Sequence, residues 1–248
     1  MYQFDWSVIP PILPLLLKGL ELTLKISVTV IVVSMIIAIP LAFARSSKVG
    51  FIRWPAQIYI ELFRGTPLLV QLIWVYYALP VVLGIALPSF TSVVLALSGN
   101  LIAFMAETYR AGLQSVPKEH VEAGQVLGLS RINVMRYIII PQAFLQQIPV
   151  ILSLVVSLFK DTSLVSTLGV QDLTYRGNIE SSELFRPMEI YTTVALIYFA
   201  VAFPATLLTS YIERRIIARQ EGEGAVTGRF SWQTVLLKTL PSRFIRGG

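Results

Sequence analysis

Cysteine is absent from the 248 residues of this chain, and histidine occurs once, at His120. A disulfide framework and a thiolate metal site are therefore excluded, as is a metal site built from several histidines. Charge is scarce as well, because 14% of the residues are Asp, Glu, Lys or Arg, against about 25% in soluble domains. With 55% hydrophobic residues and a mean hydropathy of +0.71, the composition predicts a protein that crosses a lipid bilayer several times.

Motifs for nucleotide binding and for catalysis are missing too. There is no G-x-x-x-x-G-K-[ST] loop, so the chain is not expected to bind ATP phosphates itself. No HExxH, Ser-His-Asp pattern or carboxylate cluster indicates an active site. The net charge of +6 does not indicate nucleic acid, because the basic residues lie beside apolar runs instead of forming one stripe with aromatics. We expect no catalytic residue, no cofactor or metal bound by this chain, and no nucleic-acid partner.

Uninterrupted apolar runs divide the chain into predicted spans. The run from Gly65 to Ala106 has 42 residues without a charge, which as a helix is about 63 Å long. A bilayer core is about 30 Å thick, so this run is expected to cross twice, with Pro80, Gly84 and Pro88 in the turn. The predicted fold is an all-α membrane protein whose five transmembrane helices cover residues 22–44, 58–82, 89–108, 141–159 and 190–212.

Basic residues set the predicted orientation. Arg45, Lys48 and Arg53 directly follow the first span, and cytoplasmic loops carry an excess of Lys and Arg. An N-out, C-in arrangement places fifteen of the twenty basic residues in the cytoplasm. It divides the chain into an extracytoplasmic or interfacial segment (1–21), a membrane domain (22–215) and a cytoplasmic tail (216–248). The tail ends in FSWQTVLLKTLPSRFIR, which is expected either to lie on the membrane surface or to remain a solvated basic tail.

The stretch from Ser115 to Pro141, which we call the elbow, is too charged to lie in hydrocarbon. It predicts two short helices with a break between them. Ser115 and Pro117 suit the cap and first turn of one helix, and Gly128 suits the left-handed residue that ends it. A second short helix, capped by Ser130, is expected to stop before Pro141, which would open the next span.

A family resemblance rests on the spacing within the elbow. Glu122-Ala123-Gly124, then Gly128, Ile138 and Ile140-Pro141 resemble the EAA loop, E-A-A-x3-G-x9-I-x-L-P, of the membrane subunits of ATP-binding cassette (ABC) importers. Gly124 replaces the second alanine and Ile140 replaces the leucine. Flanking segments resemble polar amino acid permeases of the histidine and glutamine type, namely ELFRGTPLLVQ (61–71), AGLQSVP (111–117), PQA (141–143) and KDTSL (160–164).

The resemblance implies a type I ABC importer permease fold with a cytoplasmic coupling helix, in the bacterial cytoplasmic (inner) membrane. Its implied function is translocation of a polar amino acid, coupled to ATP hydrolysis by a separate ATPase. The implied partners are two ABC ATPase subunits that carry ATP and Mg²⁺, an extracytoplasmic solute-binding protein, and a second permease chain, identical or paralogous. Five spans without an internal repeat also require two chains for a two-fold pore. The residues expected to couple to the ATPase are Glu122, Ala123, Gly124, Gly128, Arg131 and Pro141.

The sequence leaves two interpretations of Glu122. Its carboxylate can form a charged hydrogen bond with the ATPase, or it can brace the amides of the elbow and Arg131. Two other acids, Glu61 and Glu107, lie three residues before Arg64 and Arg110. That spacing favours a local ion pair on one helix face in each case.

Polar groups near the spans are candidates for a substrate pathway, because they are costly at membrane depth. A zwitterionic amino acid needs an acceptor for its ammonium group, which Asp161 can supply, and donors for its carboxylate. Asn100 can line a cavity or join span three to a neighbour. The predicted pathway residues are Lys160, Asp161, Thr162, Ser163, Ser98 and Asn100.

Two other classes of function stay open on the sequence alone. A secondary transporter or channel would need no ATPase and would favour intramembrane charges or an inverted repeat, and neither is visible. A membrane enzyme would need a catalytic constellation. The substrate also stays open: the acidic segment 161–189 favours cationic substrates, whereas the MYQFDW start resembles acidic amino acid permeases.

Overall fold

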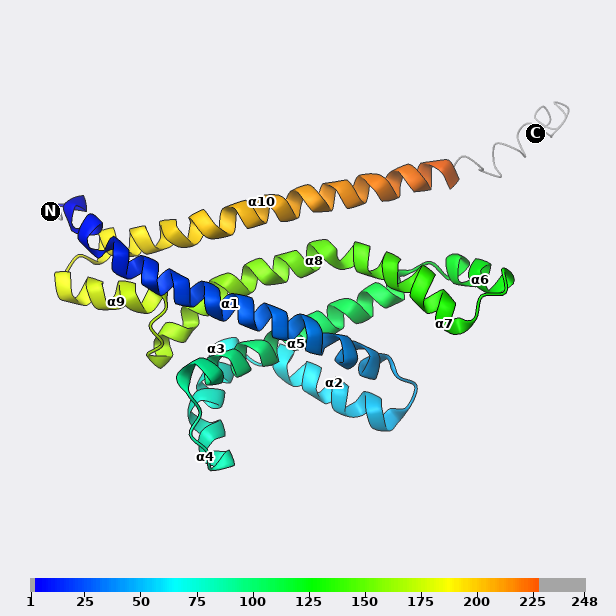
Figure 1. Ribbon diagram of the computed structural model, residues 1–248, viewed down its shortest axis with the longest axis horizontal. Helices are drawn as coiled ribbons and strands as arrows, with labels where there is room; N and C mark the ends of the chain where they lie inside the picture. The colour runs from blue at the N-terminus through cyan, green and yellow to red at the C-terminus, as the bar shows by residue number, and fades with distance from the viewer. Residues whose placement is uncertain (1–2, 228–248) are drawn as a thin grey trace, which may run out of the picture.

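The computed structural model describes residues 3–227, with side chains as far as residue 216, and every regular element in that range is helical (Figure 1). Within this described range, four helices are long and apolar enough to span a membrane, and a bent helix pair supplies a fifth if it counts as one span. The predicted all-α fold with five spans is confirmed. In chain order the elements are η1 (Trp6–Val8), α1 (Ile9–Ser46), α2 (Gly50–Gly65), α3 (Leu68–Ile73), η2 (Trp74–Ala78), α4 (Leu79–Leu83), α5 (Ser89–Ser115), α6 (Lys118–Val126), α7 (Arg131–Val134), η3 (Met135–Ile139), α8 (Ile140–Asp161), η4 (Thr162–Leu168), α9 (Leu173–Leu184) and α10 (Pro187–Thr227).

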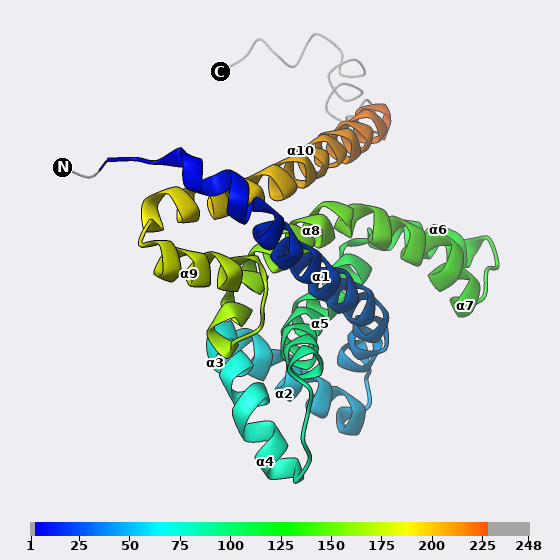
Figure 2. The ribbon, with the colours of Figure 1, turned by 60° about the vertical axis from the view of Figure 1, so that its left-hand side comes forward.

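The core is organised around α5, which contacts α1, α2 and α8 (Figure 2). Ala96 and Ala103 on α5 are fully buried. At Gly99 the ring of Phe63 comes so near that an added Cβ would lie 2.7 Å from it, and the Tyr59 hydroxyl donates to the Gly99 carbonyl (2.8 Å). Small residues bring helices together in this way in membranes, where apolar burial alone does not favour protein over lipid.

Helix α1 begins at residue 9. Most of the predicted N-terminal segment (1–21) therefore belongs to this helix. Pro10 and Pro11 lie in its first turn, where a missing N–H leaves no bond unmade. Ile12 and Leu16 are buried against Leu173 and the start of α10. The 38 residues of α1 are about 57 Å long, well beyond a ~30 Å core.

The second predicted span, 58–82, is wrong as a single straight helix. The chain bends by 110° between α2 and α3. Thr66 has the extended conformation (φ −115°, ψ 147°) that a following proline imposes, and Pro67 has no N–H to continue the ladder. The arm formed by α3, η2 and α4 therefore leaves α2 at a steep angle (Figures 1 and 2).

The segment 160–189, expected outside the spans, is folded into η4 and α9. Asp172 begins α9, where its Oδ1 accepts from the Tyr175 amide (2.8 Å). Its carboxylate is fully buried, and that burial raises the pKa of Asp172 to about 6. The helix packs on α1 at Gly19, where an added Cβ would lie 2.8 Å from the Asp172 carbonyl. The close approach leaves no room for a side chain at residue 19.

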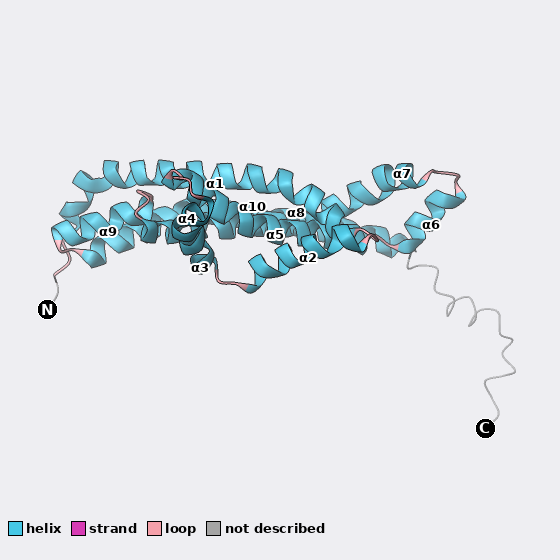
Figure 3. Ribbon diagram, turned by 90° about the horizontal axis from the view of Figure 1, so that it is seen from below, coloured by secondary structure: helices cyan, strands magenta, loops and turns pink. Residues whose placement is uncertain are grey.

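The helix of the fourth predicted span does not begin at Pro141. Instead, one helical run extends from Arg131 to Leu168 through α7, η3, α8 and η4. The π-helical turn η3 carries a bond from the Ile140 amide to the Met135 carbonyl, and this wider turn accommodates the proline without a break. The elbow and the membrane span are therefore parts of one continuous helix (Figure 3).

Candidate functional site

The break in the elbow is built at Gly128, as predicted. Its φ is +78°, a left-handed conformation that glycine adopts without a steric cost. The Gly128 amide donates to the Gln125 carbonyl (2.9 Å) and the Leu129 amide to the Gly124 carbonyl (3.1 Å). These paired bonds form a Schellman cap. Ser130 then caps α7 by accepting from the Asn133 amide (3.3 Å).

The two arms of the elbow are held together at Gly124. This residue is buried, and an added Cβ would lie 2.5 Å from the Ile138 side chain and 3.3 Å from that of Val134. The family pattern has alanine here, and Ile138 can make room for it by turning the flexible end of its side chain. A larger residue would separate α6 from α7 and η3. Packing therefore makes the elbow a compact unit instead of a slack loop.

The tip of the elbow presents apolar surface. Val126, Leu127 and Ile132 are 87%, 80% and 77% exposed, which is unusual for clustered large apolar side chains outside a membrane. Glu122 and Arg131 are both exposed, and no ion pair or hydrogen bond of the Glu122 side chain is formed within the described residues. The structure therefore does not support the interpretation in which Glu122 braces Arg131.

Of the other predicted elbow residues, Ala123 and Pro141 are also exposed. The base of the elbow is joined to the membrane span by polar side chains. His120 Nδ1 lies 2.9 Å from Gln142 Oε1, and the Ser115 hydroxyl donates to Gln146 Oε1. These contacts tie the end of α5 and the start of α6 to the first turns of α8. A displacement of the tip can therefore reach α8 along two routes, through the continuous helix and through these two polar contacts.

A second site lies further along the same helix, where a cavity of about 250 Å³ opens between α5, α8 and the bend at residues 65–67. Asp161 and Asn100 both line it, together with Thr66 and Ser157. The Ser157 hydroxyl lies 3.4 Å from Asp161 Oδ2, at the long limit for a hydrogen bond. Other walls are apolar, including Leu101 and Phe104 on α5. The polar groups that line the cavity are thus one carboxylate, two hydroxyls and one amide.

An amide network supports the cavity at the helix bend. Gln71 Nε2 donates to the carbonyls of Phe63 (2.8 Å) and Thr66 (3.0 Å) and to the Thr66 hydroxyl (2.7 Å). Asn100 Nδ2 donates to Gln71 Oε1 (2.9 Å) and to the Phe63 carbonyl (3.2 Å). The bend frees these carbonyls from the helix ladder, and non-helical backbone at membrane depth must be satisfied by protein groups. Asn100 therefore both lines the cavity and joins α5 to the bend.

The remaining predicted pathway residues do not line this cavity. Thr162 is buried, and its hydroxyl donates to the Phe159 carbonyl (2.6 Å). Ser98 is buried, and its hydroxyl has no hydrogen-bond partner among the described residues. Lys160 is exposed, and Ser163 is half-buried in η4. Sequence reasoning missed Thr66 and Ser157 as cavity residues and Gln71 as the partner of Asn100; the one signal for Gln71 was an amide inside a charge-free run.

The two predicted local ion pairs have different outcomes. Glu107 accepts from Arg110 Nε at 3.0 Å through both oxygens, which confirms that pair. Glu61 instead accepts from Gln57 Nε2 (2.7 Å). Arg64 lies over the ring of Phe104, 5.4 Å from its centroid, so the predicted Glu61–Arg64 pair is wrong. The stacked Arg64 covers Phe104 where that ring borders the cavity.

Together these features describe a helical membrane protein. Its exposed, charged elbow is joined to a polar cavity by one continuous helix. Residues 31–218 match the family model described as the binding-protein-dependent transport system inner membrane component. The chain belongs to this family, and the prediction of an ABC importer membrane subunit with an EAA loop is confirmed. It is therefore a multi-pass inner-membrane protein.

Relatives and solved structures agree with this assignment. The chain is 37% identical over 220 residues to the glutamine transport system permease protein GlnP of Escherichia coli K12, covering 88% of this chain and 99% of the relative. It is 36% identical over 222 residues to the glutamate/aspartate import permease protein GltK of Escherichia coli O6:H1, covering 87% and 99%. A crystal structure of an amino acid ABC transporter with histidines matches with a TM-score of 0.81 at 35% identity, over 86% of this chain and 100% of that one. The MetNI methionine ABC transporter in its inward-facing form shares the fold, with a TM-score of 0.69 at 16% identity over 83% and 98%.

Proposed function

We propose that this chain is the membrane subunit of an ABC importer for a polar amino acid, and that ATP hydrolysis by separate subunits drives it. The relatives include a glutamine permease and a glutamate/aspartate permease, which supports the substrate class. The observation that carries the proposal is the unbroken helical run Arg131–Leu168. One end of this run is the second arm of the elbow, and Asp161 in the cavity lies near the other.

The elbow is proposed to bind the ATPase. Its exposed apolar tip at Val126, Leu127 and Ile132 suits a pocket on a soluble partner, because burying large apolar side chains is favourable by about 25 cal/mol per Å². Glu122 is free to accept a charged hydrogen bond from that partner. Gly124 packing on Ile138 stiffens the elbow, so a push on the tip moves α8 instead of bending a loop.

The cavity is proposed to bind the substrate in transit. Its volume of about 250 Å³ lies below the 300–1,000 Å³ of drug-sized sites, which suits a molecule as small as an amino acid. Asp161 can accept hydrogen bonds from an ammonium group, while the Ser157 hydroxyl, which is held only by a long bond to Asp161, can turn to donate to a carboxylate. Movement of α8 would shift Asp161 and Ser157 against Asn100 on α5, which would open or close the cavity.

The proposed assembly contains five polypeptide chains besides lipid. Two ATPase subunits hold ATP and Mg²⁺ and bind the elbows of two permease chains, identical or paralogous. An extracytoplasmic solute-binding protein delivers substrate to the outer ends of the spans. This arrangement requires the N-out, C-in orientation, which the basic residues beside the first span favour.

Uptake into vesicles that hold the assembled transporter tests this proposal. Glu122→Ala should abolish ATP-driven uptake while leaving membrane insertion intact, because it removes the free acceptor on the elbow. Glu119→Ala is the matched control, since Glu119 is an exposed acid on the same helix α6. Equal uptake by both variants would remove Glu122 from coupling, and uptake without ATP would favour a secondary transporter.

A further inference from the structure

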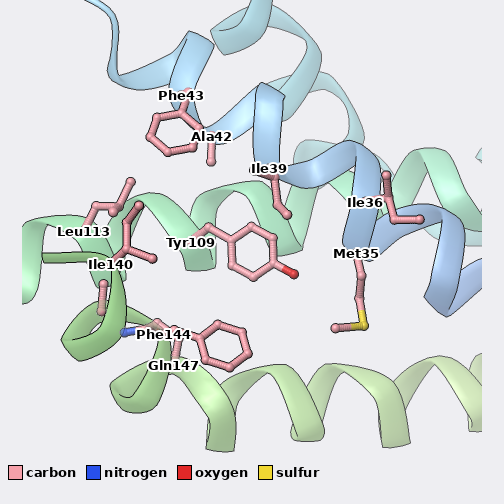
Figure 4. A pocket seen from close by; sticks show the side chains of 11 residues that line it. Met35, Ile36, Ile39, Ala42, Phe43, Tyr109, Leu113, Ile140, Phe144 and Gln147 are labelled. Carbon is pink, nitrogen blue, oxygen red and sulfur yellow. The ribbon is translucent and has the colours of Figure 1, made fainter. Parts of the chain in front are cut away.

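A second, apolar hollow lies away from the polar cavity, between α1, α5 and α8 (Figure 4). Its volume is about 390 Å³. Helices α1 and α8 both pack along α5 but touch each other little, so their side chains diverge over Tyr109 and Leu113 on α5. Figure 4 shows Ile39 and Phe43 of α1 facing Ile140 and Phe144 of α8 across this gap, with the Tyr109 ring between them. We call this hollow the α1–α8 groove.

The rim of the groove is open to its surroundings. Ile36, Ile39, Phe43 and Phe144 are each about half exposed within the described chain. Along α1 the groove extends from Met35 to Phe43, a rise of about 12 Å. One leaflet of a ~30 Å hydrocarbon core is about 15 Å deep, so the groove follows most of the depth of one leaflet.

Among the described residues, only a few polar side chains lie in or near this apolar groove. Tyr109 lies on α5 between Glu107 and Arg110, whose ion pair is expected near the membrane surface because charged groups are costly in hydrocarbon. Its hydroxyl makes no hydrogen bond to any described residue. Arg136 precedes Ile140 by four residues on the same helical run, which places the two on one face. Lys48 follows the end of α1 beyond Phe43, and both basic side chains are exposed.

The groove is apolar and about as deep as one leaflet, which matches the shape of an acyl chain. The basic residues near its surface end match the negative charge of an anionic phospholipid head group. We propose that the α1–α8 groove binds one acyl chain of such a lipid, with the phosphate near Arg136 and Lys48 and an ester carbonyl accepting from Tyr109. Basic pockets at the membrane surface between transmembrane helices attract anionic head groups in this way. This site is separate from the elbow tip and the substrate cavity, and it does not depend on coupling to an ATPase.

The charge beside the groove favours an anionic lipid over a helix from a second copy of this chain, because Arg136 and Lys48 are both basic and exposed. The tail beyond residue 227 carries Lys238, Arg243 and Arg246 among its apolar residues. Placing those charges beside hydrocarbon would be costly, whereas an acyl chain carries none.

Photolabelling in vesicles tests the proposal. The full chain is placed in vesicles of equal parts phosphatidylglycerol and phosphatidylcholine, with a trace of either lipid carrying a diazirine in its acyl chain. After illumination, the labelled residues are located by mass spectrometry. The phosphatidylglycerol probe should label residues 36–43 and 140–147 well above other lipid-facing segments. Arg136→Gln should lower that labelling about fivefold, since each basic residue near the surface contributes about one kcal/mol to binding of an anionic lipid.

Matched variants separate a specific groove from general lipid contact. Ile39→Trp should fill the groove and abolish labelling there, whereas Leu196→Trp, a similar exchange at an exposed position on α10, should leave it unchanged. Lys25→Gln, an exposed basic residue toward the other end of α1, should also have no effect. Equal labelling by both probes, an even spread of label over all exposed spans, or crosslinking of a photoreactive residue at position 39 to a second copy or to the tail would overturn the proposal. Because no ATP or uptake enters this assay, its failure is distinguishable from failure of the importer function.

Discussion

At the scale of single residues, the cavity depends on where side chains point at the end of one helix. Asp161 lines the cavity while its neighbours Lys160 and Thr162 do not. Successive residues on a helix are rotated by about 100°, so three polar residues in a row cannot share one site. The sequence run KDTSL therefore supplies one cavity residue, a buried structural hydroxyl and an exposed cation.

Asp161→Asn should weaken uptake by removing the charged acceptor from the cavity. Loss of a hydrogen bond to a charged group costs about 1.5–3 kcal/mol, so the KM for uptake should rise by roughly 10- to 150-fold. Lys160→Gln is the control, because that side chain is exposed and does not line the cavity. Initial rates over a range of substrate concentrations measure both variants. A larger effect at Lys160 than at Asp161 would place the substrate elsewhere.

The sequence signals polar groups that are costly in a membrane, but it does not say which of them line the cavity, as the charged but exposed Lys160 shows. Asp161 and Asn100 were found because a carboxylate or an amide in hydrocarbon needs a reason. Gln71 was missed as the partner of Asn100, since only the bend gives it carbonyls to satisfy. Gly128 was placed correctly because a left-handed residue leaves a local sequence signal that packing does not override.

At the scale of elements, the bend between α2 and α3 is what assembles the cavity. It directs Thr66 toward Asn100 and Asp161, and the amides of Gln71 and Asn100 satisfy the carbonyls that it frees. Length and hydropathy predicted a span here but could not predict a bend of 110°. Hydropathy responds to composition, whereas the bend begins at Thr66 and Pro67 and is supported by Asn100, a residue far along the chain.

Gln71→Leu should destabilise the bend, because the carbonyls of Phe63 and Thr66 would lose a donor. A buried polar group left without its partner costs about 1–3 kcal/mol. Gln57→Leu is the comparison, since Gln57 donates to Glu61 on the exposed surface of α2. Such a surface change usually alters stability by less than about 0.5 kcal/mol. Thermal unfolding of the purified chain in detergent should show a clear loss for residue 71 alone, and equal melting temperatures would contradict the role of the network.

The start of α9 should make stability depend on pH. Burial raises the pKa of Asp172 from 3.8 to about 6, so the folded protein holds this proton more tightly than the unfolded chain. Stability from this group is fully present below about pH 4, declines as the pH rises toward 6, and is constant above that. The total decline is on the order of 3 kcal/mol.

Asp172→Asn separates this charge from the helix cap that the same side chain provides. Asparagine caps helices about as well as aspartate, so the variant should keep α9 while losing the pH dependence between 4 and 6. It should also be more stable than the parent chain at pH 7. Melting temperatures in detergent from pH 4 to 8 measure both effects. A parent-like pH profile in the variant would show that another group titrates.

At the scale of the whole molecule, one helix connects the two candidate sites. The run Arg131–Leu168 begins in the elbow, crosses the bundle as α8 and ends beyond the cavity (Figures 1 and 3). The sequence predicted both ends but separated them at Pro141, because proline commonly opens a helix. The π turn at Met135–Ile139 keeps the helix unbroken. A single rigid element can carry a displacement over this distance, whereas a hinge at Pro141 would absorb it.

The absence of cysteine makes the central claim, that the elbow tip contacts a separate ATPase, open to a direct measurement. Leu127→Cys places the chain's single thiol at the tip, where the side chain is 80% exposed, and Val81→Cys places it at an equally exposed position on α4. Crosslinking is measured in the transport-active complex with a thiol-to-amine reagent. Leu127→Cys should crosslink to the ATPase subunit, with a yield that changes when ATP is added, and Val81→Cys should not. Absence of a crosslink from residue 127 in a complex that still transports, or a crosslink from residue 81 instead, would contradict the claim.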